Sequence, residues 1–327
     1  MQLKNMNGEE FVKKILAGER DFSGIELKHF CLSEYEGFDA LQGYLREQGE
    51  KNNLQKNPII LNSSNLEGLI ATGLYLPFVM ALGTNFYRAN FKRAVLSGAD
   101  FCEAGFSEAN FSEASLERAI LSEANLFRAN LYKANLFRAN LCFTYLFGAD
   151  LQLANLSKAD LYKANLSKAD LQEANLLQAN LSGASLIGAS LAKACLKEAD
   201  LSLTDLNSAI IFEADLSEAN LEEADFFGSN LFRANLYKAN LFRTELSHAN
   251  LSLANLSEAD ISKANLTRTN FSEADLRNIK NLESTFNLDK AIFYNTIVTE
   301  NEKNIIEKYL KPATFFIVKD QFSNENL

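Results

Sequence analysis

The apolar positions of this chain repeat every five residues over most of its length. From Phe86 to Leu276, every fifth residue is Leu, Phe or Ile without interruption, 39 positions in all. The residue two positions earlier is Ala in 33 of these repeats, and the residue between the two is Asn in 19 and Asp in 10. The unit is therefore Ala-(Asn/Asp)-Leu-x-x. A period of five fits neither an α-helix nor a β-strand, and it predicts a solenoid in which each pentad makes one short side.

The two constant apolar positions indicate the inside of a coil, because residues two apart point to the same side of a locally extended segment. The Asn or Asp between them favours a corner there, since these side chains bond nearby amides and tolerate unusual φ and ψ angles. Six repeats have another small residue in place of Ala: Thr84, Thr144, Thr204, Ser229, Thr244 and Thr269. Four of these Thr positions differ by multiples of 20, which favours four sides per coil.

This run resembles the pentapeptide-repeat proteins, and 39 consecutive in-phase units make the resemblance specific. The resemblance implies an all-β solenoid, a right-handed quadrilateral β-helix with four pentads per coil. It predicts about ten coils with short helical caps at both ends, in a rod on the order of 45 Å long at the inter-strand spacing. The opening segment Arg20 to Leu27 resembles that of cyanobacterial members.

The flanking segments suggest a division of the chain into five parts. We predict an N-terminal capping helix in residues 1–20, first pentads in 21–32, an insertion in 33–60, the pentapeptide-repeat β-helix in 61–276, and a closing segment with a capping helix in 277–327. Asn7 and Thr299 each precede a Glu by three positions, which is typical of helix N-caps. The insertion is expected to hold one helix near residues 38–47. After Leu276 the period slips by two residues, to Leu288.

Composition excludes several functional classes. The net charge of −10 and pI of about 5.0 argue against direct nucleic-acid binding. Four Cys residues do not make a disulfide scaffold, and Met1 to Lys14 lacks the apolar region of a signal peptide, so we predict a cytoplasmic protein. The uncharged stretch Gly68 to Tyr87 is long enough to span a bilayer. It keeps the five-residue phase, however, so the solenoid is favoured there over a membrane contact.

No catalytic residue, cofactor site or metal site is predicted, and we expect a protein that is not an enzyme. His29 has only Cys31 close by, and two ligand types do not make a metal site. Ser residues such as Ser107 follow the apolar position and have no evident base to activate them. Cys102 and Cys142 share a face but lie two coils apart, about 9.6 Å, which is too far for a disulfide.

Two similar segments combine aromatic and basic residues on the outside of the predicted coils. The pairs are Phe127-Arg128, Tyr132-Lys133 and Phe137-Arg138, and then Phe232-Arg233, Tyr237-Lys238 and Phe242-Arg243. One hypothesis is a cation–aromatic binding patch. The favoured interpretation is that the aromatic rings cover the corners of the coils, because an offset of 105 residues places the two copies on different sides.

One predicted face carries most of the excess negative charge. Residues 84–276 hold 17 Lys or Arg and 24 Asp or Glu, a net of −7. The face around Leu121 holds the acids that we predict as a candidate interaction face: Asp100, Glu103, Glu123, Asp160, Asp200, Glu222, Glu223 and Asp260. The alternative is ordinary solubilising charge.

The C-terminal segment contains two apolar runs that are candidate dimer contacts: Ile305, Ile306, Tyr309 and Leu310, and then Phe315 and Phe316. One arrangement is a two-fold homodimer through residues 299–318. The other folds residues 315–318 back along the last coils of the same chain.

These features predict a non-catalytic protein–protein interaction or scaffolding module, for which regulation is one role, with a protein partner that the sequence does not identify. The alternative is a DNA mimic that binds DNA gyrase or another DNA-binding protein, as the resemblance implies for a quinolone-resistance branch of the family. Duplex DNA carries one charge per about 1.7 Å, so a rod of this length would need on the order of 26 negative charges. The repeats carry a net of only −7.

Overall fold

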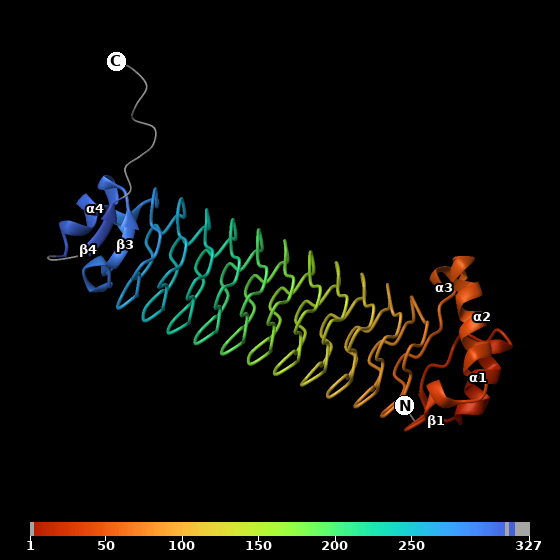
Figure 1. The fold of residues 1–327 in the computed structure, drawn as a ribbon. Helices are drawn as coiled ribbons and strands as arrows, with labels where there is room; N and C mark the ends of the chain where they lie inside the picture. Colours follow the sequence, from red (N-terminus) through yellow and green to blue (C-terminus); the bar gives the residue numbers. More distant parts are fainter. Residues whose placement is uncertain (1–2, 311–313, 318–327) are drawn as a thin grey trace, which may run out of the picture. The chain divides into compact units, whose positions relative to one another are not determined.

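The computed structural model of the chain describes residues 3–310 and 314–317. It divides into two compact units, Met1–Asn175 and Leu176–Leu327. Within each unit the repeats form coils stacked one on the next (Figure 1). Parallel bridges join residues twenty positions apart, such as Asp100 with Ile120 in the first unit and Asn235 with Asn255 in the second. One coil therefore takes four pentads, and the predicted β-helical solenoid is confirmed.

Each pentad contains one tight turn, and the turn explains the repeat. In the pentad of Leu161, the N–H of Ala164 donates to the carbonyl oxygen of Leu161 at 2.9 Å. The second central residue, Lys163, has a φ of +53°, as a type II turn requires. The same position has a positive φ throughout the repeats. The prediction that Asn or Asp forms the corner was therefore wrong, because the turn lies between the apolar residue and the following Ala.

The Asn or Asp supports this turn with its side chain. Oδ1 of Asn130 accepts a hydrogen bond from the N–H of Tyr132 at 3.0 Å, and the contact recurs along both units. Where Asn follows Asn on successive coils, the amides also join one coil to the next, as Nδ2 of Asn240 does with Oδ1 of Asn220 at 2.9 Å. These rows add side-chain bonds to the backbone bridges.

The inside of the coils is filled by the two constant apolar positions. Leu161 and Ala164 are 0% and 1% exposed, and the same holds for nearly every repeat. The six small polar substitutes are also buried. The hydroxyl of Thr144, for example, donates to the carbonyl oxygen of Leu121 at 2.9 Å. This bond offsets the cost of burying a polar atom.

The first unit begins with short elements around the first coils: β1 (Lys4–Asn5), α1 (Gly8–Leu16), β2 (Ile25–Glu26), the 3-10 turn η1 (Leu32–Glu34), α2 (Phe38–Glu50) and α3 (Asn53–Lys56). Figure 1 shows the three helices gathered beside the N-terminal coils. The predicted N-cap is confirmed, since Asn7 accepts from the N–H of Glu10 at 2.8 Å. The helix expected at 38–47 runs on to Glu50 and is followed by α3.

The segment that interrupts the repeats is packed against the first coils. Nε2 of Gln42 in α2 donates to the carbonyl oxygen of Gly73 at 3.2 Å, and its Oε1 accepts from the N–H of Tyr75 at 3.0 Å. Leu41, Leu45 and Leu54 are buried. The insertion therefore contributes to the core at this end of the first unit.

The second unit ends in the 3-10 turns η2 (Leu282–Ser284) and η3 (Leu288–Lys290), β3 (Tyr294–Val298), α4 (Glu300–Glu307) and β4 (Thr314–Ile317). The bridge from Asp260 reaches Lys280, twenty residues on, whereas the bridge from Asn270 reaches Ile292, 22 residues on. The predicted slip of two residues is thus confirmed. The N-cap expected at the start of α4 is also present, since the N–H of Thr299 donates to the Glu302 carboxylate at 2.7 Å.

β4 pairs in parallel with β3 of its own chain, with Phe316 beside Ile297 and Ile317 beside Val298. This backbone pairing corresponds to the second arrangement set out for the C-terminal run, and the two-fold dimer stays a prediction. Residue 318 lies outside the described residues. In the described part of the chain, no helix is both long enough and apolar enough to cross a membrane. The uncharged stretch 68–87 forms ordinary pentads.

Candidate interaction surfaces

Potentially reactive or metal-binding side chains lie on the outside of the coils and are dispersed. Among residues 3–310 and 314–317, no three His, Cys, Asp or Glu side chains are grouped to hold a metal ion. All four cysteines are free thiols. Burial, and then the hydrogen bond with Asp160, raises the pKa of the Cys142 thiol to about 11. Because the thiolate is the reactive form, Cys142 is a weak nucleophile at neutral pH.

In each of the six aromatic–basic pairs, the basic side chain contacts the aromatic ring of its own pair. Each cation lies over the ring of the preceding residue, at distances of 4.9 to 5.2 Å from the ring centroid. The three rings of one copy follow each other at five-residue spacing, so they lie on three successive sides of a coil. This arrangement supports the interpretation that the rings cover the corners of the coils. The three pairs of a copy lie on different sides, so they do not form a single binding patch.

A different aromatic cluster lies on one side of the first unit. The rings of Phe127, Tyr145 and Phe147 are nearly parallel, with centroids 6.0 to 6.2 Å apart. Arg128 lies over Phe127 and Lys168 over Phe147. This cluster was not predicted from the sequence. Its signal was Tyr145, which stands where most repeats have Asn or Asp.

In the first unit, the predicted acidic face combines two kinds of carboxylate. Asp100 and Asp160 are half-buried, and they occupy the bridge position that supports the turn. Asp100 accepts from the N–H of Cys102 at 3.1 Å. Glu103 and Glu123 are exposed on neighbouring coils, each with a positive φ, and neither has an ion-pair partner among the described residues. These two Glu residues are the accessible part of the face in this unit.

In the second unit, most acids of the predicted face have partners. Asp200 accepts from the N–H of Ser202 and from Nδ2 of Asn220, both at 3.0 Å. Glu223 pairs with Arg243 at 2.8 Å, and Glu222 is half-buried.

Asp260, also of the second unit, is held in its charged form. Burial acts to raise the pKa of its carboxyl. Hydrogen bonds from Ser262 and Asn281 outweigh this effect and bring the pKa below its ordinary value.

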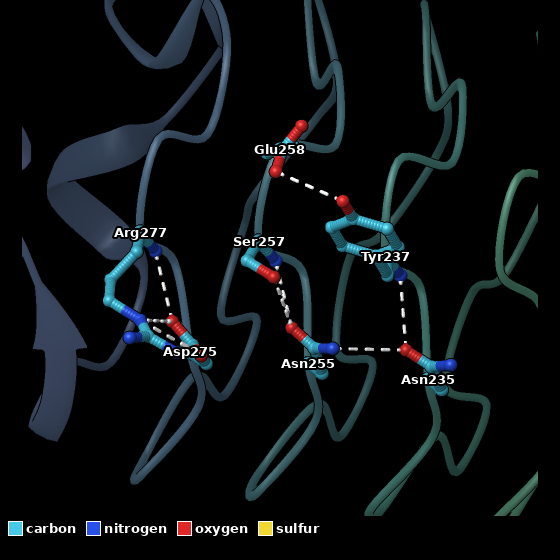
Figure 2. A network of polar contacts seen from close by, with 7 residues as sticks. All are labelled: Asn235, Tyr237, Asn255, Ser257, Glu258, Asp275 and Arg277. Carbon is cyan, nitrogen blue, oxygen red and sulfur yellow. Dashed lines mark hydrogen bonds and ion pairs between the residues drawn. The ribbon is translucent and has the colours of Figure 1, made fainter.

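Elsewhere, charges of opposite sign face each other on successive coils. Nε of Arg93 lies 2.9 Å from a Glu113 oxygen in the first unit, and Arg233 lies 3.2 Å from Glu213 in the second. The hydrogen bond from Arg93 lowers the pKa of the Glu113 carboxyl. Figure 2 shows a related network in the second unit, where the Tyr237 hydroxyl reaches Glu258 at 3.1 Å. Such exposed pairs each contribute little to stability, but they neutralise the surface locally.

The predicted dimer contacts differ in accessibility. Ile306 is buried within its own chain, so it presents no surface to a second copy. Ile305 and Leu310 are half-buried, whereas Tyr309 is 53% exposed. The backbones of Phe315 and Phe316 lie in β4, and their side chains are outside the described part of the structure.

The sequence model of pentapeptide repeats matches the chain in eight copies, over residues 81–104, 104–141, 134–172, 164–202, 209–247 and 239–278. These segments together cover more than half of the chain. The chain belongs to the pentapeptide-repeat family. No curated protein matches this pentapeptide-repeat chain.

Several solved structures are similar to this pentapeptide-repeat protein. HetL, a pentapeptide repeat protein involved in heterocyst differentiation regulation from the cyanobacterium Nostoc sp. strain PCC 7120, is 28% identical, with 88% of this chain and 97% of HetL covered and a TM-score of 0.39. Full-length QnrB1, a plasmid-mediated fluoroquinolone resistance protein, is 14% identical, with 72% and 99% covered and a TM-score of 0.21. Rfr23 from the cyanobacterium Cyanothece 51142 is 38% identical, with 32% and 60% covered and a TM-score of 0.14.

Proposed function

We propose that this pentapeptide-repeat protein is a non-catalytic scaffold that binds protein partners in the cytoplasm through the outer faces of its coils. The observation that carries the proposal is the division between a filled apolar interior and an outer surface of regularly placed charges. Leu161 and Ala164 leave no polar pocket inside their coil, whereas Lys163 between them points its charge outward. Solenoids commonly use such extended surfaces for binding.

We infer further that the solenoid is a right-handed quadrilateral β-helix and that α1 and α4 cap its first and last coils. Solenoid ends expose apolar surface and unpaired strand edges, which need cover. The buried apolar residues of α1, Phe11, Val12 and Ile15, support a capping role at the start. Ile306 of α4 and the strand pairing of β4 with β3 support one at the end.

Within the candidate interaction face, Glu103 and Glu123 are the acids best suited to meet a partner. Both are exposed on neighbouring coils and lack a cation of their own among the described residues. The Asp members support turns instead, and Glu223 is paired with Arg243. Unpaired surface acids accelerate association with a basic partner.

The alternative, a DNA mimic that binds DNA gyrase or another DNA-binding protein, needs a surface of nearly uniform negative charge. Arg88 with Glu108, and Arg243 with Glu223, place cations among the acids on successive coils. These cations argue against mimicry. A supercoiling assay with purified gyrase tests it, and inhibition at micromolar protein would restore the alternative.

The scaffold proposal is tested by capture of partners from a native lysate on the immobilised full chain at physiological salt. We compare the wild-type chain with the double variant Glu103→Gln/Glu123→Gln. The matched control is Glu113→Gln/Glu173→Gln, which changes two acids on another side of the same unit. A partner that is retained by the wild type and the control and lost by the double variant is the expected result. Repeated captures without any specific partner would contradict the proposal.

The two-fold dimer through residues 299–318 stays a separate prediction, with Tyr309 as its most accessible apolar residue in α4 and the turn after it. Light scattering at high protein concentration tests it. A mass near the 36.4 kDa of one chain would contradict the dimer.

A further inference from the structure

One side of the first unit carries a column of three cations on successive coils. Arg118, Arg138 and Lys158 lie twenty residues apart, and the bridges from Ser115 to Asn135 and on to Asn155 place them on the same side. All three are exposed and have φ values of +56° to +59°, so their side chains leave the coil at equivalent points. At the inter-strand spacing, neighbouring members are about 4.8 Å apart along the stack. We call these residues the basic column.

The basic column differs from Arg88 and Arg93, two other cations of this unit. Arg88 and Arg93 each face a Glu on the next coil, at 2.7 and 2.9 Å. In the basic column, Arg118 faces Arg138 on the next coil, and Arg138 faces Lys158. Arg118 has Glu117 at 3.8 Å, whereas Arg138 and Lys158 have no carboxylate partner among the described residues. Like charges at this spacing repel each other, and an anionic ligand would relieve the repulsion.

The basic column leads into a groove at the N-terminal end of the unit. The groove has a volume of about 500 Å³ and is lined by Gln55, Phe78, Ser97, Gly98, Glu117 and Arg118. Gln55 comes from α3, so the insertion supplies one wall. The ring of Phe78 lies over Gly98, where a Cβ atom would come within 2.6 Å of it. Phe78 has a φ of +61°, a conformation that is unusual for a bulky residue. Together they give the groove an apolar floor.

We propose that this groove and the basic column bind an extended acidic peptide that carries one apolar residue. The apolar residue lies on Phe78, and the acids pair with Arg118, Arg138 and Lys158. In an extended chain, alternate side chains on one side are about 6.6 Å apart, which long basic side chains on neighbouring coils can follow. Phe78 and Arg118 are two coils apart, about 9.6 Å, whereas four extended residues span about 13.2 Å. Residues on one side of an extended peptide differ by an even number of positions, so the matching pattern is an apolar residue followed by three spacers and then alternating acids, with the long Arg118 side chain spanning the remaining difference.

A peptide fits this surface better than a nucleic acid does. The chain has a net charge of −10, and the exposed Glu103 and Glu123 belong to the same unit. A long polyanion would meet these acids, whereas a short peptide needs only three cations in a line. Nucleic-acid binding draws most of its affinity from many phosphate contacts. This inference rests on the proposed function and specifies the chemistry of one partner.

The test is fluorescence anisotropy with the full chain and a fluorescein-labelled synthetic peptide that contains Leu-Ser-Gly-Ser-Glu-Ser-Glu-Ser-Glu, in which Leu and all three Glu lie on one side of an extended chain. A second peptide has Gln in place of every Glu. The variant is Arg138→Glu/Lys158→Glu. The matched control is Lys133→Glu, because Lys133 and Arg138 are both exposed, both have a positive φ, and both lie 5.1 Å from the ring of the preceding residue. The variant Phe78→Ser tests the apolar floor, and circular dichroism verifies that each variant is folded.

We expect the acidic peptide to bind the wild-type chain and to bind more weakly as salt is raised. Arg138→Glu/Lys158→Glu should weaken binding by about tenfold or more, and Lys133→Glu should change it by less than about twofold. The Gln peptide should not bind. Failure of the acidic peptide to bind the wild type, or an equal loss in the control, would overturn the proposal.

An oligothymidylate of equal charge is the competing probe. If it binds more tightly than the peptide and is lost in the same variant, the site takes nucleic acid and the proposal is wrong. If the wild-type chain captures a partner from lysate but does not bind the peptide, only the groove assignment fails, and the scaffold proposal stands.

Discussion

The hydroxyl of Thr244 donates a hydrogen bond to the carbonyl oxygen of Leu221 on the preceding coil, at 3.1 Å. Thr144 makes the same bond to Leu121 at 2.9 Å in the other unit. Both side chains are fully buried. The inward position of a pentad therefore accepts a residue larger than Ala where the added polar atom has a backbone partner.

The substitution Thr144→Val measures this bond, because Val has nearly the same shape without the hydroxyl. We expect a loss of about 0.5–1.5 kcal/mol in the free energy of unfolding, the usual net value of one hydrogen bond. The Leu121 carbonyl oxygen still accepts a hydrogen bond from the N–H of Ala124, at 3.1 Å, so the substitution leaves no buried acceptor without a donor. Urea denaturation followed by circular dichroism provides the measurement. A Val variant more stable than the wild type would show that the hydroxyl bond is not a net stabiliser.

The left-handed position of the turn gives a second prediction. Gly188 has a φ of +61° with nothing within 4 Å of an added Cβ, so Gly188→Ala introduces backbone strain without a clash. We expect it to lower the free energy of unfolding by about 1 kcal/mol. The reverse change is Glu173→Gly, at a φ of +57° in another pentad, which should be neutral or stabilising. Thermal melts of both variants test this prediction. Melting temperatures that shift in the same direction in Gly188→Ala and Glu173→Gly would contradict it.

Much of the fold was predictable from the sequence because one period controls it. Leu and Ala at fixed positions have to be inside a coil, and twenty-residue spacing of the Thr substitutes pointed to four sides. The slip after Leu276 was also visible, since Leu288 breaks the phase. The N-caps at Asn7 and Thr299 depend only on local sequence, so they too were predictable.

The position of the left-handed residue was not predictable from residue preference. Gly, Asn and Asp favour positive φ, yet Lys163, Glu173 and most of their equivalents are long charged residues. The stacking of coils imposes this conformation and overrides local preference. The surfaces were hard to predict for a related reason. Charge counts did not show that Glu223 is paired with Arg243 while Glu103 is not, because pairing depends on which residue lies one coil away.

The amide rows give a third prediction. Nδ2 of Asn235 donates to Oδ1 of Asp215 at 2.9 Å. Asn235→Asp replaces this donor with a second carboxylate, so two like charges would face each other on neighbouring coils. We expect a lower melting temperature at pH 7 that recovers towards the wild-type value near pH 4, where one carboxyl becomes protonated.

The control for that change is Asn110→Asp, because Asn110 is bridged to Asn90 and Asn130, which are both neutral. It should melt close to the wild type at pH 7. Equal losses in Asn235→Asp and Asn110→Asp would show that the charge on the neighbouring coil is not the cause.

The charged state of Asp260 gives the last prediction. Its pKa lies below the ordinary value of 3.8, because hydrogen bonds from Ser262 and Asn281 outweigh the effect of burial. The unfolded chain therefore binds a proton more readily than the folded chain, and stability falls as the proton is taken up. This contribution is fully present above about pH 4 and is lost as the pH falls through the folded pKa. Asp260→Asn removes it, so the variant should lose less stability than the wild type below pH 4. NMR titration of the Asp260 carboxyl measures the cause directly, and a midpoint above 3.8 would contradict the prediction.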